Sequence, residues 1–147
     1  QCGGEAIIAH RFKAYEPMKG EIPARINGVL ISKETGMATG YSMDKLKDRG
    51  RFFIEPGDQI YAGQVIGEQI RPGDLIVNVC TAKQLTNFRA AGKDDNVGLP
   101  PKIDFSLEES MEYVEKDEYL ELTPKSMRLR KIHLDENERK KAAQKAG

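Results

Sequence analysis

IEPGDQIYAGQVIGE, at residues 54–68, places two turn signals within one short stretch. Pro56 and Gly57 suit a tight turn, and Gly63 permits a second reversal before apolar and polar residues alternate again from Gln64. Two reversals this close together predict closely folded antiparallel strands.

Glycine, proline and aspartate also separate short β-like runs throughout residues 26–80. The runs are INGVLIS, TGMATGYS, GRFFIEPG, YAGQVIGEQI and DLIVNVC. Their spacing favours a meander or a small barrel. We predict an α+β fold that is mainly β, with an antiparallel β-barrel from about Ile26 to Ile132.

A short amphipathic helix is predicted over residues 107–115. Ser106, followed three residues later by Glu109, forms a capping box, the usual signature of a helix start. The apolar residues of the segment make a one-sided stripe, which predicts that they are buried. They are Leu107, Met111 and Val114.

The sequence YLELTPKSMRLRKI, at residues 119–132, alternates as one or two strands broken at Pro124. Its alternation puts Met127, Leu129 and Lys131 on one face, and Arg128 and Arg130 on the other. The following DENERKKAAQKA resembles a C-terminal helix, with acids first and bases last as the helix dipole favours.

The composition is that of a soluble chain with one ordinary domain. It has 147 residues, of which 39% are hydrophobic and 31% charged. No apolar run approaches the roughly twenty residues of a membrane helix, and the start lacks the layout of a signal peptide. We therefore expect no membrane partner and a cytoplasmic location. The abrupt start QCGG, without methionine, suggests a fragment of a longer polypeptide, although a processed terminus would look the same.

Two cysteines, Cys2 and Cys80, indicate neither a disulfide framework nor a metal site. Cys80 ends an apolar run that includes Val77 and Val79, so we expect it to be reduced and enclosed.

The net charge of zero conceals a strong segregation of charge along the chain. Residues 104–122 contain eight acids against Lys116 alone, whereas residues 125–147 contain eight bases against three acids. Such a basic tail is typical of contact with a polyanion or an acidic partner. Two alternatives remain, namely a solvated terminal helix and internal neutralisation of the bases by the acidic segment.

The sequence contains no recognisable catalytic equipment. His10 and His133 are far apart and belong to no ligand-spaced cluster. A phosphate-binding G-x-x-x-x-G-K-[ST], a nucleophile elbow and a G-x-G-x-x-G are all missing. We predict that this chain has no catalytic residues, no metal site and no cofactor of its own.

TAKQLTNFRAAGKDDN, at residues 81–96, fits neither a strand nor a long helix. If it continues to Pro100, the connection is about twenty residues long, and connections of that length are commonly functional or disordered.

These stretches together resemble the C-terminal part of the TypA/BipA translational GTPase family, over nearly the whole chain. The matching segments are RINGVLIS, DRGRFFIEPGDQIYAGQVIGE, LIVNVC, KQLTNFRAAGKDD, FSLEESMEYVEKDEYLELTPKSMRLRK and LDENER. The most specific elements are Leu85–Thr86–Asn87, then Arg89 and Ala90, and the run from Thr123 to Ser126.

The resemblance implies a domain arrangement. Residues 1–25 would be the last strand of a domain similar to domain V of elongation factor G, and residues 26–147 the family's distinctive barrel with helices. The GTPase domain, with its GTP and magnesium, would belong to the parent protein and not to this chain.

The resemblance also implies partners. Family members bind the ribosome, as 70S or 50S particles, and assist large-subunit assembly and growth under stress, so ribosomal RNA and transfer RNA are the expected partners of a monomer. The long loop would reach the acceptor end of transfer RNA.

The implied RNA-binding residues lie in that loop and in the basic tail. They are Lys83, Gln84, Leu85, Thr86, Asn87, Phe88, Arg89, Ala90, Ala91, Gly92, Lys93, Lys125, Arg128, Arg130 and Lys131. The loop chemistry suits RNA, because cations reach phosphates, Asn87 can hydrogen-bond base edges and Phe88 can stack. Phe88 stands where many relatives have methionine and Gln84 where they have lysine, so stacking is not a family-wide mechanism. The alternative is a protein-interaction module whose basic tail docks an acidic partner.

Overall fold

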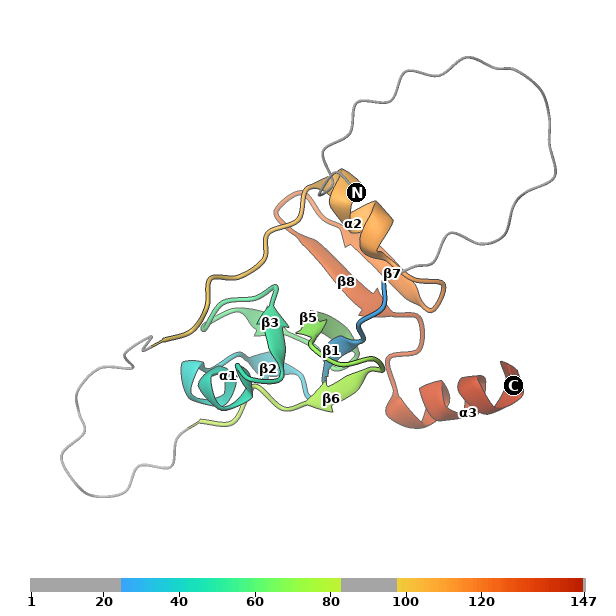
Figure 1. Ribbon diagram of the computed structural model, residues 1–147, viewed down its shortest axis with the longest axis horizontal. Coiled ribbons are helices and arrows are strands. Elements are labelled where there is room, and N and C mark those ends of the chain that lie inside the picture. The colour runs from blue at the N-terminus through green and yellow to red at the C-terminus, as the bar shows by residue number, and fades with distance from the viewer. Residues whose placement is uncertain (1–24, 83–97, 147) are drawn as a thin grey trace, which may run out of the picture.

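The computed structural model describes residues 25–82 and 98–146 (Figure 1). The strand expected within residues 1–25 and the loop residues 83–97 fall outside the described residues, apart from Arg25 itself. The predicted domain boundary near residue 25 lies at their edge and stays a prediction.

The centre of the fold is a six-stranded sheet. Its strands follow the order β6-β1-β5-β8-β7, with β3 also paired to β5. The elements of the sheet are β1 (Val29–Ser32), β3 (Gly50–Phe52), β5 (Gln64–Gln69), β6 (Leu75–Val77), β7 (Glu118–Leu122) and β8 (Met127–Lys131). A separate pair is formed by β2 (Gly36–Met37) and β4 (Gln59–Ile60).

The described strands form a mainly β α+β fold, as predicted, but the sheet does not close into a barrel. Its two end strands, β6 and β7, are not paired with each other within the described residues. All pairings are antiparallel except that of β1 with β6, which is parallel. β5 runs antiparallel to β1, and the turn after β5 crosses the start of β1. The chain then returns on the other side of β1, so β6 runs parallel to it.

That crossing requires a glycine at position 28. The backbone N–H of Gly28 donates to the carbonyl of Arg71 at 3.0 Å, and a Cβ at Gly28 would lie 1.7 Å from the carbonyl oxygen of Gly73. No side chain fits in this gap, so glycine at position 28 is what allows the two backbone segments to approach this closely.

The central strands are buried on both faces, which divides the core in two. Leu30 and Ile66 point into one cluster with Phe52, while Val29 and Val65 point into the other. Successive residues of a strand face opposite sides, so the continuous apolar runs of β1 and β5 supply both clusters.

Both predicted turns are present. Gly57 and Gly63 have φ values of +98° and +85°, which favour glycine. The reversals do not simply fold neighbouring strands together, because β3 pairs with β5 while β4 leaves to pair with β2.

The prediction of a β-run at TGMATGYS is wrong for its second half, which forms helix α1 (Gly40–Leu46). The Thr39 side chain accepts a hydrogen bond from the backbone N–H of Ser42 at 3.3 Å and so caps the helix. Burial of Ser42 and Met43 then holds α1 on the core.

Helix α2 (Leu107–Tyr113) has the predicted capping box, but its buried face was predicted wrongly. Leu107 and Met111 are 42% and 63% exposed, whereas Ser110 is buried and Val114 partly buried. The helix is rotated relative to the prediction because it docks through Tyr113, whose ring lies 5.6 Å from that of Phe53.

Helix α3 (Glu136–Ala146) ends the chain as predicted, and none of its residues is buried. Asp135 begins it, accepting from the backbone N–H of Asn137 at 2.8 Å and of Glu138 at 3.2 Å.

Cys80 is a free cysteine, as predicted, but it is only half-buried rather than enclosed. It packs against the core cluster from the segment that follows β6, where the chain has already left the sheet.

A buried ion network joins Arg25, which precedes β1, to strands β7 and β8. Lys131, in β8, is 1% exposed, and its ammonium lies 2.9 Å from Glu118, 2.8 Å from Asp117 and 2.6 Å from Asp74. Arg25 reaches the same Glu118 carboxylate, with one nitrogen at 2.9 Å. The predicted RNA-binding residue Lys131 thus lies on the inward face of β8, and its charge is paired inside the domain.

The network makes a testable demand on stability. Changing Lys131 to methionine removes one partner of a buried carboxylate, so Lys131→Met should lower the free energy of unfolding by about 3 kcal/mol or more. Lys125→Met, the same substitution on the exposed turn of the same hairpin, should change it by less than about 0.5 kcal/mol. Urea unfolding of both variants measures the difference, and equal effects would contradict a stabilising network.

Candidate nucleic-acid interface

The four basic residues predicted on the 125–131 hairpin differ in what they contact. Lys131 is buried, as described above. Arg130 lies 2.8 Å from a carboxylate oxygen of Glu121 through its Nε, and its guanidinium lies 5.1 Å from the centre of the Tyr119 ring. Among the described residues, Lys125 and Arg128 form no ion pair, so these two cations are left for an external anion.

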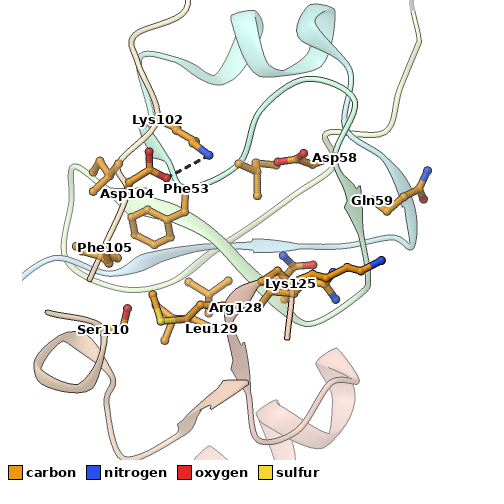
Figure 2. A pocket seen from close by; sticks show the side chains of 16 residues that line it. Phe53, Asp58, Gln59, Lys102, Asp104, Phe105, Ser110, Lys125, Arg128 and Leu129 are labelled. Carbon is orange, nitrogen blue, oxygen red and sulfur yellow. Dashed lines mark ion pairs between the residues drawn. The ribbon is translucent and has the colours of Figure 1, made fainter. Parts of the chain in front are cut away.

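Lys125 and Arg128 lie at the edge of a hollow of about 470 Å³ (Figure 2). One wall is the β8 strand with Leu129, and the opposite wall is the segment that contains Lys102 and Phe105. Figure 2 shows the side chains of Lys102 and Asp104 on the wall facing Lys125 and Arg128.

The other charged groups of the hollow have partners. Lys102 lies 3.1 Å from Asp104 and 3.6 Å from Glu55. The Asp58 carboxylate accepts from the backbone N–H of Glu55 at 2.8 Å. In the lining, Asp58 and Asp104 therefore have hydrogen-bond or ion-pair partners on one wall. Lys125 and Arg128, on the other wall, form no ion pair among the described residues.

Aromatic rings form the inner end of the hollow. The Phe53 and Phe105 ring centres are 5.0 Å apart, and Phe105 lies 4.9 Å from Tyr113. Sequence reasoning missed these residues because Phe53 and Phe105 meet only through the fold, and no local pattern pairs them.

Nearby, Tyr61 is hydrogen-bonded to a residue of β7. Its hydroxyl donates to Glu121 at 2.6 Å. Burial and that hydrogen bond raise the pKa of Tyr61 far above its ordinary value, so it stays neutral at physiological pH.

The predicted loop residues Lys83 to Lys93 lie outside the described residues, but both ends of the loop are visible. The carbonyl of Thr81 accepts from the hydroxyls of Thr39 at 2.7 Å and Ser42 at 2.6 Å. On the other side, Leu99 packs against the core and the backbone N–H of Ile103 donates to the carbonyl of Phe52 at 2.8 Å. Helix α1 and strand β3 therefore fix the two points between which the loop extends.

One cluster of acids in the described residues has the spacing of a metal site, made by Glu115, Asp117 and Glu118. These carboxylates face cations of the chain itself, since Arg25 pairs with Glu115 and Glu118, and Lys131 with Asp117 and Glu118. We assign the cluster to the ion network.

Comparison with known proteins decides the family. Residues 27–136 match the TypA/BipA C-terminal domain, a range that includes every strand of the sheet. The chain belongs to the TypA/BipA C-terminal domain family.

Similar proteins share this domain at high identity. The Large ribosomal subunit assembly factor BipA of Bacillus subtilis (strain 168) is 48% identical over 143 residues, covering 97% of this chain and 23% of that protein. The protein of the same name from Synechocystis sp. is 49% identical over 129 residues, covering 88% and 22%. The corresponding Haemophilus influenzae protein is 46% identical over 140 residues, covering 95% and 23%.

The chain thus spans less than a quarter of the length of these BipA proteins. In the part of the chain that the structure describes, no helix combines the length and apolar character needed to cross a membrane.

The division of the hairpin cations into paired and free ones can be measured. Arg130→Ala should lower the free energy of unfolding by about 1 kcal/mol, because it removes both the Glu121 and the Tyr119 contact of a partly exposed guanidinium. Arg128→Ala, two positions away on the same strand face, should cost less than about 0.5 kcal/mol. Thermal and urea unfolding compare the two, and a larger loss in Arg128→Ala would show that Arg128 is the structural cation.

Proposed function

We propose that this chain is the ribosome-contacting C-terminal domain of a translational GTPase that acts in assembly of the large ribosomal subunit. Two relatives that carry this assembly role in their name, from Bacillus subtilis and Synechocystis sp., are 48% and 49% identical to it over the matched residues. The GTP and magnesium of the parent would be held in another domain.

The observation that carries the proposal is the positive charge of Lys125 and Arg128 at the hollow that Ile103 also lines. Thr81 and Ile103, on either side of residues 83–97 in the sequence, are hydrogen-bonded to the body of the domain. Lys125 and Arg128 add two cations on the described surface, where phosphate groups provide the matching charge.

In this proposal the loop reaches RNA and the hairpin cations support it. Lys83, Arg89 and Lys93 bind phosphates, while Asn87 and Thr86 donate to or accept from sugar and base edges. The target of the loop tip is the acceptor end of transfer RNA, and ribosomal RNA surrounds the rest of the surface.

A second candidate function rests on α3. None of its residues is buried, and it carries Arg139, Lys140, Lys141 and Lys145. An acidic protein partner could dock there, which would make the domain a protein-interaction module. Part of the helix charge is already used internally, because Lys140 pairs with Glu136 at 2.6 Å.

The proposal is tested by removing the three loop cations together. Lys83→Ala, Arg89→Ala and Lys93→Ala in one chain should leave unfolding nearly unchanged, within about 0.5 kcal/mol for each site. The affinity for purified 50S subunits should fall. The slope of log affinity against log salt should shrink by up to about 3, if each cation contributes roughly 0.7 to 0.9.

A matched variant separates the two candidate functions. Lys140→Ala, Lys141→Ala and Lys145→Ala remove the same charge from α3. The proposal predicts a clearly smaller loss of 50S binding for this variant than for the loop variant. If the loop variant binds with unaltered affinity and salt slope while the α3 variant loses binding, the RNA role of the loop is wrong and the second candidate replaces it.

A further inference from the structure

A second hollow, of about 410 Å³, lies between α1 and the chain that leaves β6. Figure 1 shows α1 beside this part of the chain, and the hydrogen bond from Ser42 to the Thr81 carbonyl ties the two together. Its lining includes Leu46, Leu75 and Val77, which belong to one core cluster and form the apolar floor of the hollow.

The charged side chains that line this hollow are all positive. Lys45 and Arg49 stand at its edge, both exposed, and no carboxylate belongs to its lining. A carboxylate on the same helix, Asp44, is paired with Lys47 at 2.8 Å. The first hollow differs, because Asp58 and Asp104 line it. An anion therefore finds two cations here without a competing carboxylate in the lining.

The remaining polar groups suit a nucleotide. The Lys45 ammonium lies 4.2 Å from the centre of the Tyr41 ring, so a cation and an aromatic face are held together at the edge of the hollow. The Asn78 side-chain oxygen accepts from the backbone N–H of Cys80 at 2.9 Å. This bond fixes the amide, whose NH₂ group is then the part left to donate to a ligand.

These groups match what a single-stranded nucleic acid requires. Cations bind the phosphate, an aromatic or apolar surface takes the face of an unstacked base, and an amide reads the base edge. A duplex offers no free base face to an apolar floor, so the fit is to an unpaired nucleotide.

We propose that the α1–β6 hollow is a nucleotide subsite for single-stranded RNA. Lys45 and Arg49 contact phosphates, Tyr41 with the apolar floor takes a base, and Asn78 donates to its edge. This inference rests on the proposed function of ribosome and RNA binding. The subsite uses residues that differ from those of the loop 83–97 and from the cations of residues 125–131.

No pattern in the sequence marks these residues as a site. They come from two segments, 41–49 and 78–81, that the sheet brings together across the pairing of β1 with β6. The β-run predicted at TGMATGYS would place Tyr41 in a strand, where it would not share a helix face with Lys45.

The experiment compares the whole chain with two variants of equal charge. The probe is a fluorescein-labelled ten-nucleotide oligouridylate, and 50S binding is measured in parallel. Lys45→Ala with Arg49→Ala should weaken oligonucleotide binding at least about tenfold and reduce the salt slope by about 1.4, for two phosphate contacts at roughly 0.7 each. Lys141→Ala with Lys145→Ala, in exposed α3, should change the affinity less than about twofold.

The role of the base is tested at Tyr41. Tyr41→Phe keeps the ring and should bind the oligonucleotide like the unaltered chain, whereas Tyr41→Leu should weaken binding severalfold. Circular dichroism of each variant confirms that α1 is retained, and a variant that loses it is replaced by Asn78→Leu, which should weaken binding without touching the helix.

The outcomes distinguish the two proposals. If the unaltered chain binds RNA and 50S subunits and the Lys45/Arg49 variant binds as well as it does, the subsite is wrong while the proposed function stands. Equal losses in the Lys45/Arg49 and Lys141/Lys145 variants would show general charge attraction and also overturn the subsite. If the unaltered chain binds neither RNA nor 50S subunits, both proposals fail.

Discussion

The carboxylate of Glu118, buried between Arg25 and Lys131, is the interaction on which the rest of the described structure depends. It lies at the start of β7, and its partners come from the first described residue and the last residue of β8. Through Lys131 the network also reaches Asp74, at the end of the turn that crosses β1. One network of ion pairs thus joins Arg25 ahead of β1, the β7–β8 hairpin and the turn between β5 and β6. Removing these groups from water is costly, so such a network stabilises the fold only when every member is paired.

The same pairing sets the pH range over which the network holds. Burial alone would raise the pKa of Glu118, but hydrogen bonds from Arg25 and Lys131 outweigh it and lower the pKa below its usual value. A lowered carboxyl pKa contributes stability that is present above the unfolded-state value and is lost as pH falls through the folded-state pKa. Burial would lower the pKa of Lys131, yet its three carboxylate partners raise it, so that contribution is lost only as pH rises through the raised value. The network therefore persists across the neutral range, and the surface cations are presented on a fixed body.

Sequence patterns predicted the features that local chemistry determines. The capping box at Ser106, the break at Pro124 and the reversals at Gly57 and Gly63 depend on a few neighbouring residues, and each is present. Features set by distant contacts were predicted wrongly. Alternation placed Lys131 on the same face as Leu129 but could not show that its charge is paired inside the domain, because Asp74 and Glu118 meet it only through the sheet.

Helix α2 illustrates the same limit, since its buried face is chosen by the ring of Phe53 rather than by its own apolar stripe. Helix α1 was missed because threonine and tyrosine favour strands locally, whereas the helix depends on the cap at Thr39 and on burial of Ser42 and Met43. The sequence likewise could not show that Lys125 and Arg128 line the same hollow as Phe53 and Phe105. These residues come from separate segments, which only the fold brings together.

The central claim is that this domain by itself binds the large ribosomal subunit through charge presented on a rigid body. Cosedimentation of the purified chain with 50S subunits, over a range of potassium chloride concentrations, tests it most directly. The account predicts that the chain pellets with the subunits at low salt and that its affinity falls linearly, on logarithmic axes, as salt rises. A chain that remains folded by circular dichroism but stays in the supernatant at every salt concentration would contradict it.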